Sequence, residues 1–110
     1  MSHLFDKSCK PCEKGGTALA HQESAELLSK IDSNWVISQQ NDRLSRDFHF
    51  KNYYQTIAFV NSLAWIAHRE DHHPDLEVGY NHCQVNYATH SIGGLSENDF
   101  ICAAKIDALL

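Results

Sequence analysis

One helical segment without glycine or proline lies between two strand-like stretches, and this arrangement constrains the fold more than any other feature of the sequence. Residues 53–71 carry apolar side chains at the three- to four-residue spacing of an amphipathic helix. The helix must end before Pro74, because the residue preceding a proline disfavours helical dihedral angles. Upstream, Leu44, Phe48 and Phe50 share one side of a period-two pattern, which predicts a strand that is buried on one face.

Shorter patterns complete the predicted set of elements. A helix is expected over residues 17–31, and strands over residues 35–40, 76–81 and 84–90. Ser96 can cap a last helix that runs to the C-terminus, with Glu97 and Asp99 favourably placed at its positive end. The order is α-β-β-α-β-β-α, and both hairpins are too short for a parallel crossover. The sequence therefore predicts an α+β fold with a four-stranded antiparallel sheet and helices packed on one face.

Length and charge exclude several classes of function. A chain of 110 residues, of which 43% are hydrophobic, is the size of one globular domain. Its formal net charge of -5 has the wrong sign for binding nucleic acid or an anionic membrane. No apolar run approaches the roughly 20 residues needed to span a bilayer, and the first ten residues lack the apolar core of a signal peptide. We therefore expect a cytoplasmic protein.

The four cysteines divide into a close pair and two single residues. Cys9 and Cys12 form a Cys-x-x-Cys in residues 1–16, which are rich in lysine and glycine and are predicted to be a tail preceding a domain over residues 17–110. Cys83 and Cys102 lie in apolar patterns that predict small buried side chains. A zinc site would lack its second close-spaced ligand pair. A metal-binding redox or storage protein, using the tail cysteines and the histidines, nevertheless stays open as an alternative.

Histidines are the most unusual feature of the composition. Of eight in the chain, five fall within 23 positions: His68, His72, His73, His82 and His90. Asp71, His72 and His73 stand together at the predicted helix end, and His90 follows the second hairpin, so a single pocket could collect them. Imidazoles exchange protons near neutral pH, which favours acid/base chemistry, and Asp71 could orient one ring.

Two other interpretations of these histidines compete with acid/base catalysis. Histidines at the C-terminal end of a helix are stabilised by its dipole, so the pair before Pro74 could simply end the helix in solvent. His68 and His72 share a helical face, as zinc ligands do in metalloproteases. The glutamate that follows the first histidine in that motif is replaced by Arg69, which disfavours a metal-dependent hydrolase.

The segment from Glu70 to Phe100, EDHHPDLEVGYNHCQVNYATHSIGGLSENDF, carries a more specific signal. It combines His-His-Pro, an aromatic residue at Tyr80, Thr89-His90 with Gly-Gly-Leu shortly after, and an acid at Asp99. This segment resembles the signature region of pterin-4a-carbinolamine dehydratases. The upstream elements are also similar, so that the resemblance covers nearly the whole chain after about Thr17.

The resemblance implies a dehydratase that needs neither a cofactor nor a metal. Its reaction removes water from a 4a-hydroxytetrahydropterin to give quinonoid dihydropterin, which supports the recycling of tetrahydropterin in aromatic amino acid hydroxylation. By matching position, His72 and His90 are the acid/base groups, and His73 helps to hold the pterin beside the catalytic Asp99. The implied substrate contacts are Asp71, His73, Thr89 and His68.

The resemblance also implies partners and leaves specificity open. Members form homodimers or homotetramers, and an aromatic amino acid hydroxylase is a further candidate partner. Animal members bind the dimerisation helices of a transcription factor, so a protein-interaction or regulatory partner is the alternative function. His68 stands where some relatives carry a glutamate, and Asn98 replaces an arginine of animal members. Both departures leave the preferred pterin undetermined. A function in pterin metabolism linked to molybdenum cofactor would produce the same motif.

Overall fold

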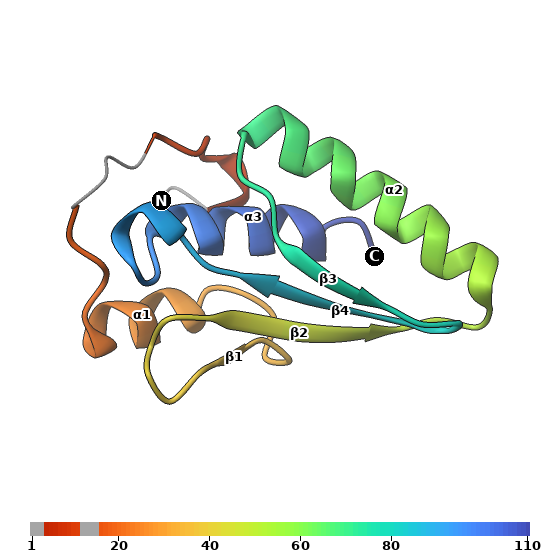
Figure 1. The fold of residues 1–110 in the computed structure, drawn as a ribbon, viewed down its shortest axis with the longest axis horizontal. Helices are drawn as coiled ribbons and strands as arrows, with labels where there is room; N and C mark the ends of the chain where they lie inside the picture. Colours follow the sequence, from red (N-terminus) through yellow and green to blue (C-terminus); the bar gives the residue numbers. More distant parts are fainter. Residues whose placement is uncertain (1–3, 12–15) are drawn as a thin grey trace.

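The chain folds as one four-stranded sheet covered by helices. The computed structural model describes residues 4–11 and 16–110. The strands β1 (Val36–Ile37), β2 (Leu44–His49), β3 (Asp75–Val78) and β4 (His82–Tyr87) are ordered β1-β2-β4-β3, and all neighbours pair antiparallel. The helices are α1 (His21–Leu28), α2 (Tyr53–Glu70) and α3 (Glu97–Asp107), with short 3₁₀ turns η1 (Leu4–Asp6) and η2 (His90–Ile92) (Figure 1). The predicted α+β fold and its element order are confirmed.

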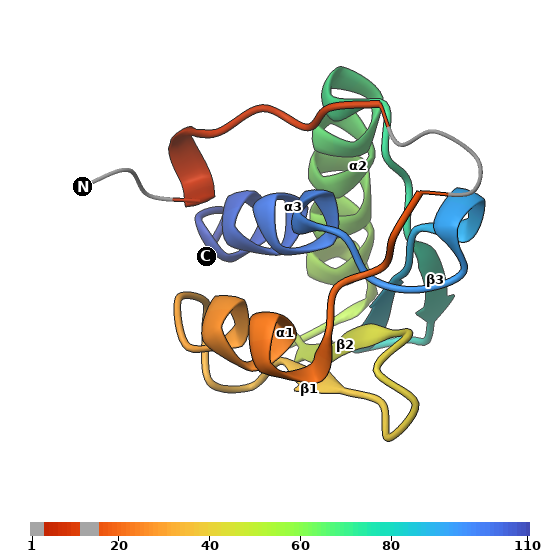
Figure 2. The ribbon, with the colours of Figure 1, turned by 90° about the vertical axis from the view of Figure 1, so that its left-hand side faces the viewer.

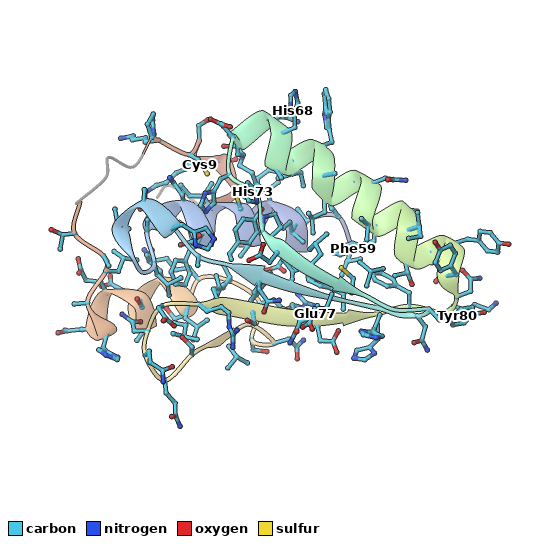
Figure 3. All side chains as sticks on the ribbon, viewed as in Figure 1. Cys9, Phe59, His68, His73, Glu77 and Tyr80 are labelled. Atoms are coloured by element: carbon cyan, nitrogen blue, oxygen red, sulfur yellow. The ribbon has the colours of Figure 1, made fainter. Side chains whose placement is uncertain are left out.

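All three helices cover the same face of the sheet. Register places Leu44 opposite Tyr87 and Phe48 opposite Cys83, so these four buried side chains point toward the helices. Figure 2 shows α1, α2 and α3 together on that side. Figure 3 shows Phe59 between α2 and the sheet, with Glu77 on the opposite face.

Arg46 is the one charged residue on the apolar side of β2, and its contacts explain why it is tolerated there. Its guanidinium lies 4.2 Å from the centre of the Phe48 ring and 2.8 Å from Oδ1 of Asp107 at the end of α3. The same carboxylate oxygen accepts a hydrogen bond of 2.8 Å from Nε1 of Trp35. The charge is therefore paired where the sheet meets α3, as a partly buried charge requires.

Two predicted elements are shorter than the sequence patterns indicated. The first helix begins at His21 rather than at residue 17, because Leu19 is held extended by bonds from its N–H to Leu95 O and from Asn41 Nδ2 to its carbonyl. The first strand contains only Val36–Ile37 rather than residues 35–40, because the Ser38 hydroxyl accepts from the N–H groups of Asp42 and Arg43 and closes a turn.

The second hairpin also differs in its boundaries. His82, which lies between the two predicted strands, is the first residue of β4, and the strand ends at Tyr87 rather than at residue 90. His90 instead begins η2, which turns the chain back toward α3. This turn moves His90 out of the sheet and onto the rim of a pocket.

Residues 4–11 lie against α3. Leu4 is buried in the hydrophobic core, and Nζ of Lys7 lies 3.0 Å from Oε2 of Glu97. Figure 2 shows this N-terminal segment running alongside α3 toward the end of α2. Cys12, the second cysteine of the Cys-x-x-Cys, lies outside the described residues. Within the described ranges, no helix combines the length and the apolarity that crossing a membrane requires.

Candidate active site

The end of α2 releases the two adjacent histidines from the helix. Asp71 takes a left-handed conformation with φ 52°, which is tolerated better by aspartate than by most residues, and so reverses the chain. The N–H of His72 then closes the helix by donating to Ala67 O at 3.1 Å. Pro74 follows and prevents further helix. This helix end turns His72 toward α3 and leaves His73 exposed.

His72 is held on three sides. Its Nε2 donates to Oδ1 of Asp99 at 2.6 Å, and its ring stacks on the Tyr87 ring with 5.2 Å between centres. The Tyr87 hydroxyl donates to the carbonyl of His72 at 3.2 Å. The imidazole is only 13% exposed, so its orientation is fixed before any ligand arrives.

Asp99 is fully buried in the first turn of α3, and both of its carboxylate oxygens are used. Oδ2 accepts from the Thr89 hydroxyl at 2.9 Å and from the Ser96 N–H at 3.0 Å, which completes a capping box. Oδ1 accepts from His72. Because an ionised carboxylate only accepts, the proton of neutral His72 sits on Nε2, and Nδ1 has no partner among the described residues. Nδ1 can therefore exchange a proton with a ligand.

The charge state of His72 depends on opposing effects. Burial lowers the pKa of the imidazole, but the hydrogen bond to Asp99 and the negative charge of that carboxylate outweigh it. Cys102 and Asp71 add smaller effects in the same direction, so that the net pKa of His72 is raised. The ring is accordingly protonated at a higher pH than a free histidine.

A pocket of about 530 Å³ opens at this end of the molecule, and five of the predicted site residues line it. They come from the end of α2 and from the start of η2: Asp71, His72, His73, Thr89 and His90. Asp99 stands behind the pocket, in contact with it through His72 and Thr89. His72 and Asp99, which are 27 positions apart in sequence, are thus brought together where α2, β4 and α3 meet.

Two predictions about individual residues need correction or refinement. The carboxylate bonded to His72 is Asp99 and not Asp71. His68 lies in a neighbouring hollow of about 390 Å³, which shares Asp71, His72 and His73 with the main pocket. Its ring lies 5.4 Å from that of Trp65, and Figure 3 shows it on the outer side of α2.

The N-terminal segment forms a wall of the pocket that the sequence did not predict. Cys9, Lys10 and Pro11 all line the pocket. The amide of Asn98 bonds both backbone groups of Lys10, at 3.0 Å and 2.6 Å, and Glu70 Oε1 accepts from the Cys9 N–H at 2.9 Å. These partners lie 61 and 88 positions apart, a separation that no local pattern reveals. Nowhere in the described part of the chain are three His, Cys, Asp or Glu side chains grouped to hold a metal ion.

Gly93 fixes the turn that presents His90. Its φ is +67°, and its N–H donates to His90 O at 3.2 Å. Among the described residues, no atom lies within 4 Å of the position that a Cβ would occupy, so the expected cost of Gly93→Ala is that of the left-handed backbone. We expect a loss of about 1 kcal/mol in the free energy of unfolding, measured by urea denaturation. Unchanged or increased stability would contradict a left-handed residue 93 in solution.

Comparisons with known proteins agree on one family. The family described as pterin 4 alpha carbinolamine dehydratase matches residues 17–109. A Nitrosomonas eutropha protein, provisionally named a pterin-4-alpha-carbinolamine dehydratase, is 59% identical over 97% of this chain and 93% of its own. A Legionella pneumophila protein with the same provisional name is 52% identical over 99% of this chain and 96% of its own.

Solved structures show the same fold. A transcriptional coactivator/pterin dehydratase from Brucella melitensis superimposes with a TM-score of 0.79 and 32% identity, covering 84% of this chain and 98% of that one. A pterin dehydratase-like protein, identified as a RuBisCO assembly factor in the alpha-carboxysome, gives 0.60 and 26%, covering 69% and 88%. The profile match over most of the chain, together with relatives above half identity, leads to one conclusion: the chain belongs to the pterin-4-alpha-carbinolamine dehydratase family.

Proposed function

We propose that this protein is a hydro-lyase that removes water from 4a-hydroxytetrahydropterin and releases quinonoid dihydropterin. The observation that carries the proposal is the buried His72–Asp99 pair at a pocket that His90 also lines, where Nδ1 of His72 has no hydrogen-bond partner within residues 4–11 and 16–110. Family membership supplies the substrate class. In a cytoplasmic setting, the reaction would support the recycling of tetrahydropterin for aromatic amino acid hydroxylation.

The elimination needs one proton donor and one proton acceptor. The bond between C4a and the hydroxyl oxygen breaks as that oxygen takes a proton, N5 loses its proton, and a double bond forms between N5 and C4a. Because the pKa of His72 is raised, we assign its Nδ1–H as the acid that protonates the leaving hydroxyl. His90, which is exposed and lines the same pocket, is then the base for the N5 proton.

The other pocket residues suit binding rather than proton transfer. The pterin ring presents an amino group and a ring N–H, and a carboxylate such as Asp71 can accept hydrogen bonds from both. His73 is exposed at the same rim and offers a flat ring against the heterocycle. The Thr89 hydroxyl already donates its hydrogen bond to Asp99. We therefore propose that Thr89 positions the edge of the pterin ring that lies nearest the Asp99 carboxylate. His68, in the adjoining hollow, would contact a substituent that extends beyond the ring.

A protein-interaction or regulatory function is the second candidate, favoured by the coactivator and assembly-factor names of the two solved relatives. Large aromatic side chains lie exposed on α2, where Tyr54 is 81% and Trp65 is 60% accessible. Such a surface suits a protein partner, and we propose that it takes part in a homodimer or homotetramer. An interaction function predicts that substitutions at His72 and His90 leave the biological role intact.

The direct test is the decay of 4a-hydroxytetrahydropterin, generated in situ by a phenylalanine hydroxylase and followed by ultraviolet absorbance. We expect the wild-type protein to accelerate the decay in proportion to its concentration. His49→Ala is the matched control, because His49 lies in β2 on the sheet face away from the helices and should leave the rate unchanged. A folded wild-type protein that gives no acceleration over buffer contradicts the enzyme proposal and directs the search to protein partners.

A further inference from the structure

Two cysteine sulfurs from distant parts of the chain are in contact beside the pocket. Sγ of Cys9, in the N-terminal segment, lies 3.5 Å from Sγ of Cys102 in α3. Both are free thiols, and the proposed dehydration uses neither of them. Cys9 lines the pocket and is half-buried, whereas Cys102 is fully buried directly behind it. A small molecule entering the pocket therefore reaches Cys9 first, with Cys102 as its immediate neighbour.

The backbone on each side of Cys9 is anchored, so this contact is built into the fold. The N–H of Cys9 donates to Glu70, its thiol lies 3.7 Å from the carbonyl of Asn98, and the next residue is held on both sides by the Asn98 amide. Further upstream, Leu4 is fixed in the core. A disulfide has an S–S length of about 2.05 Å, so joining the two sulfurs requires an approach of roughly 1.5 Å.

The surroundings make one member of the pair the better nucleophile. The hydrogen bond from Cys9 lowers the pKa of Cys102; burial opposes this effect, and the Tyr87 hydroxyl and the positive charge of His72 reinforce it. The same contact with Cys102, together with burial, raises the pKa of Cys9, which therefore keeps its proton. Cys83 has no such neighbour, and burial raises its pKa to about 11. Thiolate character, which favours nucleophilic attack on an oxidised sulfur, is thus concentrated at Cys102.

We propose that Cys9 and Cys102 form a reversible oxidation site, at which peroxide joins the N-terminal wall of the pocket to α3 through a disulfide bond. The sulfur of Cys9, which lines the pocket, attacks one peroxide oxygen, the O–O bond breaks, and the hydroxide that leaves takes the Cys9 proton to become water. The thiolate of Cys102 then displaces hydroxide from the resulting sulfenic acid, and this hydroxide takes a proton from solvent and leaves as a second water. Peroxide gains two electrons and the two thiols lose them; a dithiol reductant reverses the change.

The disulfide bond would affect the pocket by tethering its N-terminal wall to α3. Cys9, Lys10 and Pro11 form that wall by non-covalent contacts alone in the reduced protein. In the oxidised protein, residues 93 positions apart are covalently joined, so the wall cannot separate from α3 without reduction. The inference rests on the position of the sulfurs and not on the proposed dehydration.

The test exposes the reduced full-length protein to hydrogen peroxide, blocks the remaining thiols and maps the cross-links by mass spectrometry. Cleavage by trypsin is combined with a glutamate-specific protease, because no Lys or Arg lies between Cys83 and Cys102, whereas cutting after Glu97 separates them. No tryptic cut separates Cys9 from Cys12, since Pro11 follows Lys10. Wild type is therefore compared with Cys9→Ser and with Cys12→Ser as the matched control.

We expect a cross-link from the N-terminal peptide to the Cys102 peptide in wild type and in Cys12→Ser, and none in Cys9→Ser. Dithiothreitol should remove it. Oxidation should also raise the Tm of wild type by roughly 10 °C, and leave that of Cys9→Ser unchanged. A cross-link that survives in Cys9→Ser but is lost in Cys12→Ser would overturn the proposal. So would oxidation of Cys102 to sulfinic acid without any cross-link, or a zinc ion retained stoichiometrically by the reduced thiols.

Discussion

His72→Ala is expected to lower the turnover number for 4a-hydroxytetrahydropterin by about 10²- to 10⁴-fold, with a much smaller change in KM. The substitution removes the imidazole whose Nδ1 we assign as the acid, while His73, Asp71 and Thr89 remain to bind the pterin. The loss should therefore fall on the chemical step. Because alanine leaves the ring's volume empty beside Tyr87, added imidazole should restore part of the activity.

The measurement is the initial rate of absorbance change at several substrate levels, with the uncatalysed decay subtracted. His49→Ala again serves as the control, since it removes a histidine on the far face of the sheet. Circular dichroism confirms that His72→Ala is folded. Retention of wild-type turnover by this variant, combined with complete loss in His90→Ala, would show that His90 performs both proton transfers and that the His72–Asp99 pair is structural.

Asp99→Asn is expected to lower the free energy of unfolding by about 3 kcal/mol at pH 6, and by clearly less at pH 9. The carboxylate is fully buried and is bonded to His72, Thr89 and Ser96. The asparagine amide has one accepting oxygen in place of two, so it cannot accept from Thr89, Ser96 and a protonated His72 through two oxygens as the carboxylate does. A neutral His72 can instead accept from the amide NH2 by changing its tautomer, which reduces the loss at pH 9. At pH 6 the variant also leaves the His72 imidazolium without its counter-charge.

The pH dependence follows from the direction of the His72 shift. A pKa that is raised in the folded protein contributes stability that is fully present below the unfolded value of about 6.5 and is lost as pH rises through the folded value. Since Asp99 causes the rise, the stability difference between wild type and Asp99→Asn must narrow on going to alkaline pH. Urea unfolding at pH 6 and at pH 9 measures this narrowing.

Asp47→Asn provides the matched control for the Asp99 experiment. Asp47 is a half-exposed carboxylate that also lies near histidines, 3.4 Å from His49 and from His82 on the outer face of the sheet. Because solvent screens that cluster, its substitution should change stability by less than about 1 kcal/mol at either pH. A difference between wild type and Asp99→Asn that is the same at both pH values would contradict the charged pair in the folded protein.

Local patterns predicted the elements of this fold but not their ends. The alternation around Phe48 and the uninterrupted stretch from Tyr53 identified β2 and α2 correctly. The boundary of β1 depends instead on side-chain bonds of Ser38 within a turn, and that of α1 on a bond to a distant chain segment, from Leu19 N–H to Leu95 O. The periodicity of a short sequence segment cannot reveal the bond between Leu19 and Leu95, because the two residues lie 76 positions apart.

The residues of the site likewise divide into those that local patterns identified and those that depend on distant packing. The doubled histidine before Pro74 and the Thr89-His90 pair marked the pocket, since they lie at element ends that the pattern located. The choice of Asp99 over Asp71 as the partner of His72 depended on how α3 packs against the end of α2, which spacing along the chain does not determine. The same packing brings the N-terminal segment to the pocket through Asn98, a residue marked in the sequence only as a departure from animal relatives.

One carboxylate both closes the first turn of α3 and orients the imidazole of His72. A substitution at this position therefore changes the stability of the helix start and the orientation of His72 together. A substitution of Asp99 that weakens the first turn of α3 would be selected against because it also lowers activity. A substitution of Asp99 that lowers activity would also destabilise the fold. Compensation must come from neighbours such as Ser96, which bonds Asp99 through its backbone N–H, so descendants of this chain should vary there before they vary at residue 99.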